Sequence, residues 1–217
     1  ARPAGGDIGI EAMKALSGKD AAREFLRLFG GEDALLLVLD PAGKAGPVAL
    51  RGAGLLDKAQ ALNDQKRGIY YHLNLPADGL VKKATKADII GVGAIGFDFD
   101  YPDTGGVADA ARAILQAKIT ELETGPLPPS IILSSGGGIQ ALWLLDCEQP
   151  MPATPEMVAM FEGIGKAVRA RHGGDDVSNI DRVMRVPGFT NWPTAAKAAR
   201  GQMPAEAIVL GGTGTMY

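Results

Sequence analysis

The most distinctive stretch of this 217-residue chain is residues 179–191, NIDRVMRVPGFTN. Alternating polar and apolar side chains predict a short strand over 182–186 that ends at Pro187-Gly188. Because alternate side chains of a strand share a face, Asp181 and Arg185 are expected on the same side. A carboxylate beside a guanidinium there suits a site for metal and phosphate, and the alternative is an exposed ion pair.

The remainder of the chain predicts strands interleaved with helices, and some of the strands form hairpins. Apolar periodicity predicts helices over 8–16, 18–29, 107–122 and 154–173. Short β-rich or continuous apolar runs predict strands over 35–39, 48–50, 68–75, 92–100, 131–133, 139–145 and 207–210. This mixture predicts an α+β fold.

Two acidic residues close the run VGAIGFDFD at 92–100. On a strand, Asp98 and Asp100 point the same way while Phe97 and Phe99 pack behind them. Two carboxylates so placed repel each other unless a cation lies between them, and hard oxygen donors suit Mg²⁺ or Mn²⁺. The alternative is a strand that merely emerges into solvent at a turn.

Three consecutive glycines join two predicted strands in the segment SSGGGIQALW at 134–143. Glycine allows a positive φ and a close approach of backbone N–H groups to an anion, which is how many proteins hold phosphate. The segment lacks the spacing of a Walker loop or a dinucleotide-binding fingerprint, and a plain hairpin turn remains the alternative.

Charge and composition narrow the chemistry. The formal net charge is −3, yet residues 165–200 hold seven basic side chains against three acidic ones, so the last third is locally basic. One cysteine and two histidines exclude a Cys-based zinc site and leave carboxylates as the plausible metal ligands. With neither a membrane span nor a signal peptide in the sequence, a cytoplasmic protein without a membrane partner is expected.

Taken in order, the acidic pair, the glycine loop with its Trp-bearing strand, and the 179–191 motif resemble the archaeo-eukaryotic primase superfamily. The likeness covers roughly residues 68–200 and is greatest to replication primases of plasmids, phages and integrated elements. It implies a primase-like catalytic core over 68–217, with an RRM-like antiparallel sheet flanked by helices. A small N-terminal α/β module, residues 1–67, is expected to pack on that core.

The resemblance also implies roles for individual residues. Asp98, Asp100 and Asp181 would be catalytic and ligate two divalent metals, with Asp176, and then Asp175, as other choices for the third acid. Nucleotide contacts would come from Ser135, Gly136, Gly137, Gly138, Gln140, Arg182, Arg185 and Asn191. Gln140 stands where the family has a His, and it keeps a hydrogen-bond donor there. DNA contacts would come from Lys82, Lys83, Lys197 and Arg200. Tyr70, Tyr71 and Trp192 are candidates for base stacking, although the tyrosines also suit the core.

The implied function is a DNA primase or primase-polymerase that makes primers on single-stranded DNA by two-metal nucleotidyl transfer. It would use Mg²⁺ or Mn²⁺ with NTPs or dNTPs, and replicate a mobile element in the cytoplasm of a bacterial or phage-infected cell. A helicase domain or protein is a possible partner.

Three other readings remain open. A haloacid-dehalogenase-type phosphatase also begins with Asp-x-Asp, but it wants Thr or Val where Pro102 stands. A rolling-circle nuclease is suggested only by His72 beside two tyrosines. The third reading is a catalytically inactive domain that binds nucleic acid or nucleotide, which the Gln140 substitution favours.

Overall fold

The computed structural model describes residues 8–147 and 149–217, so the first seven residues of the expected N-terminal module lie outside the described part. The helices are α1 (Ile10–Lys14), α2 (Gly18–Leu26), α3 (Leu55–Asp64), α4 (Ala108–Thr124), α5 (Pro155–His172) and α6 (Ala195–Ala199), with 3₁₀ turns at Arg27–Phe29, Gly31–Asp33 and Lys86–Asp88. The strands are β1 (Leu36–Leu39), β2 (Val48–Leu50), β3 (Gly68–His72), β4 (Leu75–Pro76), β5 (Ile89–Val92), β6 (Ala94–Phe99), β7 (Ile131–Ser134), β8 (Ile139–Leu144), β9 (Met151–Pro152), β10 (Val183–Arg185), β11 (Thr190–Asn191), β12 (Ala205–Glu206) and β13 (Ile208–Gly211).

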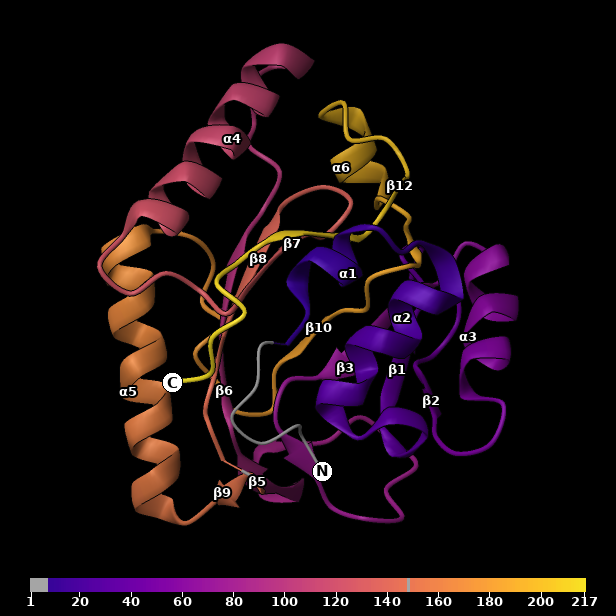
Figure 1. Ribbon diagram of the computed structural model, residues 1–217. Coiled ribbons are helices and arrows are strands. Elements are labelled where there is room, and N and C mark those ends of the chain that lie inside the picture. The colour runs from indigo at the N-terminus through magenta and orange to yellow at the C-terminus, as the bar shows by residue number, and fades with distance from the viewer. Residues whose placement is uncertain (1–7, 148) are drawn as a thin grey trace.

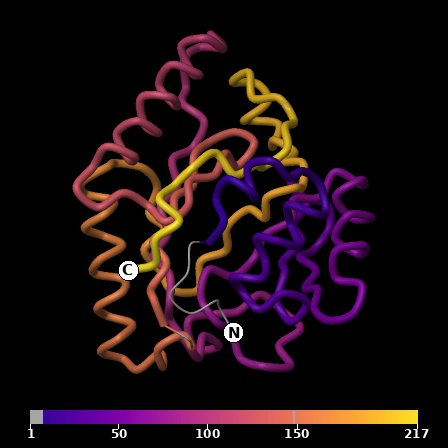
Figure 2. Tube along the Cα trace, in the orientation of Figure 1, coloured from indigo at the N-terminus to yellow at the C-terminus, as the bar shows by residue number. Residues whose placement is uncertain are grey.

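Two four-stranded antiparallel sheets organise the described residues. One has the strand order β10-β3-β1-β2 and the other β13-β7-β8-β6. Smaller sheets join β4, β5 and β9, and β11 with β12. The late strand β10 pairs with the early strand β3, so two segments far apart in the chain lie side by side, orange beside purple in Figure 2.

The β13-β7-β8-β6 sheet is covered on both faces. In β7, Ile131 and Leu133 face one hydrophobic cluster, built with the other sheet, α1 and α2, whereas Ile132 faces a second cluster. This alternation is the two-residue period of a strand. The second cluster includes Leu122 of α4 and Phe161 of α5, and Figure 1 shows these two helices along one side of the sheet.

The α+β class is confirmed, and the expected helices and strands are present with ends shifted by a few residues. Two expectations need correction. The strand expected over 92–100 is divided at Gly93 into β5 and β6, which belong to different sheets, because the Asn74 side chain accepts hydrogen bonds from the N–H groups of Gly93 and Ala94 at 3.0 and 3.2 Å. The strand expected over 68–75 likewise divides into β3 and β4.

The sequence pattern does not predict α3 or α6. The buried face of α3 consists of Leu55, Ala59 and the polar Asn63, so its apolar period is weak. Helix α6 has only five residues, none of them buried. The division expected between residues 67 and 68 stays a prediction; in the structure, β3 shares a sheet with β1 and β2. Within the described residues, no helix is long and apolar enough to cross a membrane.

Candidate active site

The acidic pair lies at the end of β6, on the face of its sheet that looks toward β10. Asp98 is paired across the sheet with Gln140 of β8, and Phe97 is buried on the opposite face with Phe99 packed beside it. The pKa of Asp98 is raised to about 6, first by burial and then by the negative charges of Asp100 and Asp175. Asp98 is therefore a half-buried carboxyl whose negative charge is poorly compensated.

Asp100 has a cationic partner from the far end of the chain. The Lys197 ammonium of α6 donates to both carboxylate oxygens of Asp100, at 2.6 and 2.8 Å. The structure thus brings Lys197, expected at a DNA contact, directly onto one of the expected metal ligands.

The three choices for a third acid lie in different places. Asp175 donates its backbone N–H to the Asp98 carbonyl at 2.9 Å, and its charge acts on the Asp98 carboxyl. Asp176 is exposed, accepts a hydrogen bond from Ser178 at 2.8 Å and faces Arg169. Asp181 accepts from Asn179 at 2.8 Å, and its charge acts on His72. The structure therefore brings Asp175 to the pair.

Glycine explains why Asp175 reaches Asp98. Gly174 has a φ of +95°, and a Cβ at this position would lie 2.5 Å from the Asp98 carbonyl oxygen. Only glycine combines that φ with so close an approach. The Gly-Gly-Asp sequence at 173–175 is the signal that points to this acid.

Gln140 connects the two sheets beside the acids. Its side chain is buried, hydrogen-bonds Asp98 and lowers the pKa of that carboxyl, and its Oε1 accepts from the Arg185 backbone N–H at 3.1 Å. The Arg185 guanidinium lies over the Tyr70 ring, 4.2 Å from its centroid. A Cβ on Gly68 would lie 2.3 Å from Arg185 Nη1, so glycine makes room for the arginine.

Arg185 is a half-buried cation that faces the acids, and its Nη1 atom is buried. Burial lowers its pKa, whereas Tyr70, Asp98 and Asp100 raise it. Its Nη1 has no hydrogen-bond partner among the described residues. Arg182 is half-buried, and its charge lowers the pKa of Asp98. Both arginines expected to contact nucleotide therefore lie within electrostatic reach of the acidic pair.

The glycine loop is packed against protein on several sides. Each of the three glycines would clash with a neighbour if it carried a Cβ: Gly136 with the Ala205 carbonyl, Gly137 with Gln202, and Gly138 with the Phe99 carbonyl. Ser134 Oγ accepts from the Gly136 N–H and Ser135 Oγ from the Gly138 N–H, at 3.3 and 3.0 Å. Two of the donors expected to face a phosphate are thus used inside the loop.

Other expected site residues have structural partners. The buried Asn191 side chain donates to the Ser135 carbonyl at 2.8 Å, which ties β11 to the glycine loop. Trp192 Nε1 donates to the Asn63 carbonyl at 3.0 Å. Tyr71 is fully buried beside Phe25, so it is a core residue and cannot stack on a base.

The lysines expected to contact DNA lie on two segments. Lys82 and Lys83 are exposed before the 3₁₀ turn at Lys86–Asp88, and Lys82 faces Asp88. Arg200 follows α6 and is half-buried. Gln202 also lies at the site although the sequence does not predict it: its side chain is 3% exposed and packs against Gly137. No local pattern in the sequence distinguishes this glutamine from a surface residue.

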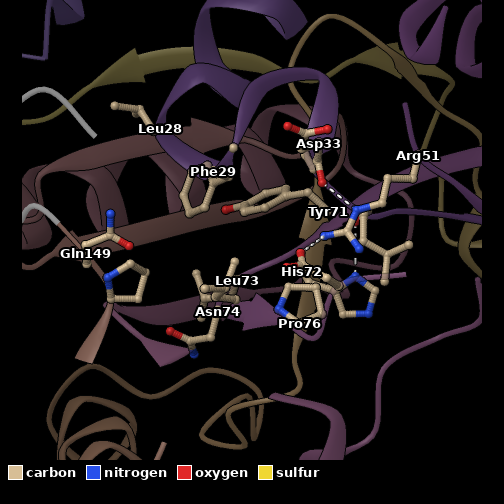
Figure 3. Close-up of a pocket in the computed structure, with 16 residues that line it drawn as sticks. Leu28, Phe29, Asp33, Arg51, Tyr71, His72, Leu73, Asn74, Pro76 and Gln149 are labelled. Carbon is tan, nitrogen blue, oxygen red and sulfur yellow. Dashed lines mark hydrogen bonds and ion pairs between the residues drawn. The ribbon is translucent and has the colours of Figure 1, made fainter. Parts of the chain in front are cut away.

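A cavity of about 180 Å³ lies elsewhere, beside His72 and Arg51 (Figure 3). Arg51 donates to the carbonyls of Asp33 and Ala77, at 2.7 and 3.2 Å. Because neither Asp98 nor Asp100 lines this cavity, it is no part of the candidate site.

The acidic side chains of the site are the possible ligands of a divalent cation. Among residues 8–147 and 149–217, no group of three His, Cys, Asp or Glu is arranged to hold a metal ion. The charges of Asp98 and Asp100 nevertheless interact: burial first, and then the negative charges of Asp100 and Asp175, raise the pKa of Asp98, and a cation would compensate those charges. This pair fits one hard divalent ion such as Mg²⁺ or Mn²⁺, provided that Lys197 leaves Asp100.

Comparisons with known proteins agree with this architecture. Residues 109–208, from α4 to β13, match the family model of the RepB DNA-primase N-terminal domain. The whole fold is similar to the AEP domain of the cyanophage S-2L primase-polymerase, with a TM-score of 0.61, 20% sequence identity and 92% of each chain covered. The fold is that of an archaeo-eukaryotic primase. The resemblance inferred from the three motifs is thereby confirmed.

The two matches differ in what they cover. The RepB family match contains the glycine loop and the 179–191 motif of this primase-fold domain but begins after Asp98 and Asp100. The structural match includes nearly the whole chain. No curated protein shows significant similarity to the sequence. Both matches are to primases, the family model over residues 109–208 and the fold over nearly the whole chain.

Proposed function

We propose that this primase-fold domain is a nucleotidyltransferase that synthesises primers on single-stranded DNA. Asp98 and Asp100 would hold Mg²⁺ or Mn²⁺, with Asp175 as the third acid in preference to Asp181 and Asp176. The observation that carries this proposal is the position of Asp98 and Asp100 beside the glycine loop, facing Arg182 and Arg185, with the charge of Asp98 poorly compensated. Phosphoryl transfer requires carboxylates that bind a metal ion and basic side chains that bind phosphate, and this site has both side by side.

When bound, the divalent cation would neutralise triphosphate charge and lower the pKa of the attacking 3′-hydroxyl. The protein's own groups position the nucleotide. Arg185 presents Nη1, which has no partner among the described residues, as a charged donor for a phosphate oxygen. Gln140 accepts from the Arg185 backbone N–H and hydrogen-bonds Asp98, so it holds the arginine and the acid in fixed positions relative to each other.

The setting of the reaction is also part of the proposal. One structurally similar protein is a cyanophage primase-polymerase, which supports a role in replicating a mobile element. A replication primase works where the duplex has been opened, so a helicase is the expected partner. Single-stranded DNA would then be the template and NTPs or dNTPs the substrates.

The test is primer synthesis on a single-stranded template with Mg²⁺ or Mn²⁺ and labelled NTPs or dNTPs. In the double variant Asp98→Asn, Asp100→Asn, the yield is expected to fall at least about a hundredfold, because metal-ion stabilisation of the transition state is worth several kcal/mol. Asp103→Asn, an exposed acid three residues further on, is the matched control and should retain synthesis. Full synthesis by the double variant would exclude the metal assignment.

A second candidate is a domain that binds nucleotide and DNA without chemistry. It is favoured by Lys197 on Asp100 and by the two loop N–H groups already bonded within the loop. Binding of both nucleotide and DNA without primer synthesis, whichever divalent metal is supplied, would establish it.

Hydrolysis of a generic phosphate ester would instead support the phosphatase alternative. The nuclease alternative has little support, because both ring nitrogens of His72 are bonded within the fold.

A further inference from the structure

Helix α6 is a small element attached by few contacts. It consists of Ala-Ala-Lys-Ala-Ala and buries none of its residues, and its N-cap Thr194 accepts from the Lys197 N–H at 3.3 Å through its side chain. Gly201, with a φ of +91°, follows it and lies against Gly106, at the end of the molecule where α4 begins (Figure 1). Since α6 adds nothing to the hydrophobic core, its position depends on specific polar contacts.

The first such contact is the ion pair on the acidic pair. Lys197 Nζ lies 2.6 and 2.8 Å from the two oxygens of Asp100, and both side chains remain partly exposed. An ammonium so placed supplies positive charge where the proposed function requires a divalent cation. Lys197 and the cation therefore compete for the same carboxylate.

The second contact is made by Gln202 on the glycine loop. Its side chain is 3% exposed and packs so closely on Gly137 that a Cβ added to this glycine would overlap Gln202 Nε2. Its Oε1 has no hydrogen-bond partner among the described residues. A buried acceptor without a partner is costly, so opening this contact to water recovers part of that cost.

The chain on either side of these contacts is fixed. Before the segment, Asn191 is bonded to the Ser135 carbonyl and Trp192 to the Asn63 carbonyl. After it, β12 pairs with β11. Residues 194–202 thus span two anchored points and touch the candidate site at one acid and one glycine.

We propose that residues 194–202 form a latch over the candidate site, in which Lys197 occupies Asp100 and competes with the divalent cation for that carboxylate. The inference rests on the proposed function of Asp100. Cation binding then releases α6, and closure of α6 opposes cation binding by the same factor. Release also frees the Lys197 ammonium for an incoming phosphate.

The direct test is to titrate the purified protein with Mn²⁺ in the absence of nucleotide. The electron paramagnetic resonance signal of free Mn²⁺ measures how much of the ion is bound. Lys197→Met is expected to bind Mn²⁺ about fivefold more tightly than the unmodified protein, the factor that corresponds to an ion pair of roughly 1 kcal/mol. Lys14→Met is the matched control, because it removes the same charge and the exposed pair with Glu11. Equal affinity in Lys197→Met and in the unmodified protein would overturn the latch.

Hydrogen exchange of the unmodified protein gives a test that needs no variant. Mn²⁺ should accelerate exchange of the amides of 195–202 and leave those of α3 unchanged, whereas slower or unchanged exchange in 195–202 contradicts the latch. The outcomes separate the two proposals. If Mn²⁺ binds and α6 is released but no primer is made, the proposed function alone is refuted. If primers are made but Lys197→Met leaves the Kd for Mn²⁺ unchanged, the latch alone is refuted.

Discussion

At the scale of single residues, His72 shows how a buried polar group is held in one protonation state. Its Nδ1 lies 3.1 Å from the Leu35 carbonyl, and its Nε2 accepts from the Ala84 N–H at 3.1 Å. These partners assign the neutral tautomer with the proton on Nδ1. Burial lowers the pKa below 6.5, as do Lys83 and Arg51, whereas the Leu35 carbonyl and Asp181 raise it. The ring fastens the otherwise exposed segment around Ala84 to β3.

This geometry predicts acid sensitivity. Because the folded pKa of His72 lies below 6.5, the unfolded chain binds more protons between these values, and the contribution of His72 to stability is lost as the pH falls below about 6.5. Thermal unfolding followed from pH 8 to pH 5 should show this loss. His72→Leu should be about 1–3 kcal/mol less stable at pH 8, because it leaves the Ala84 N–H unsatisfied, and should show a flatter pH profile.

His172→Gln is the control for the pH profile, since it removes the other histidine of the chain. If the profile flattens in His172→Gln and not in His72→Leu, the assignment to His72 is wrong.

At the scale of elements, the turn after α5 brings Asp175 to β6. Gly173 and Gly174 both have positive φ, 71° and 95°. Their surroundings differ: nothing lies within 4 Å of a Cβ on Gly173, whereas a Cβ on Gly174 would meet the Asp98 carbonyl at 2.5 Å and the Phe97 ring at 2.8 Å. The pair therefore separates backbone strain from steric overlap.

Two alanine substitutions test this difference by urea unfolding. Gly173→Ala should lose about 1–3 kcal/mol, because its φ of 71° with a ψ of −159° is a conformation that is essentially restricted to glycine. Gly174→Ala should lose about 1–3 kcal/mol more than that, because overpacking against β6 is added to the strain of its positive φ. Losses of equal size would show that the close approach of Gly174 to β6 does not exist in solution.

At the scale of the whole molecule, the charge is unevenly distributed. The net charge of −3 combines a locally basic segment over 165–200 with an acidic remainder. The structure folds part of that segment back over the acids, as Lys197 on Asp100 and Arg182 near Asp98 show. Net charge is thus a poor guide to whether this molecule binds DNA.

Binding of single-stranded DNA is expected to weaken steeply with salt, because contacts to the backbone release counterions. Fluorescence anisotropy with an oligonucleotide at several salt concentrations measures the slope. Lys82→Gln with Lys83→Gln should reduce its magnitude by about 1.4, which is roughly 0.7 for each lost phosphate contact. Lys14→Gln with Lys58→Gln removes two exposed lysines elsewhere and should leave the slope unchanged. Equal slopes in both double variants and the unmodified protein would remove Lys82 and Lys83 from the DNA surface.

The sequence by itself determined the class of fold, most helices and strands, and the family resemblance, because these depend on local periodicity and short motifs. Alternation along 94–99 and 139–144 predicts which side chains share a face. It was sufficient to place Asp98 and Asp100 together and Phe97 behind them.

Only the tertiary structure decided which distant groups meet at that face. The Asp175 backbone N–H bonds the Asp98 carbonyl, Gln140 holds the Arg185 backbone, and Lys197 occupies Asp100. These contacts join residues far apart in the chain, and they follow from turn geometry and from the pairing of β10 with β3. Local periodicity carries no information about such pairings, since it describes each segment in isolation from its neighbours in space.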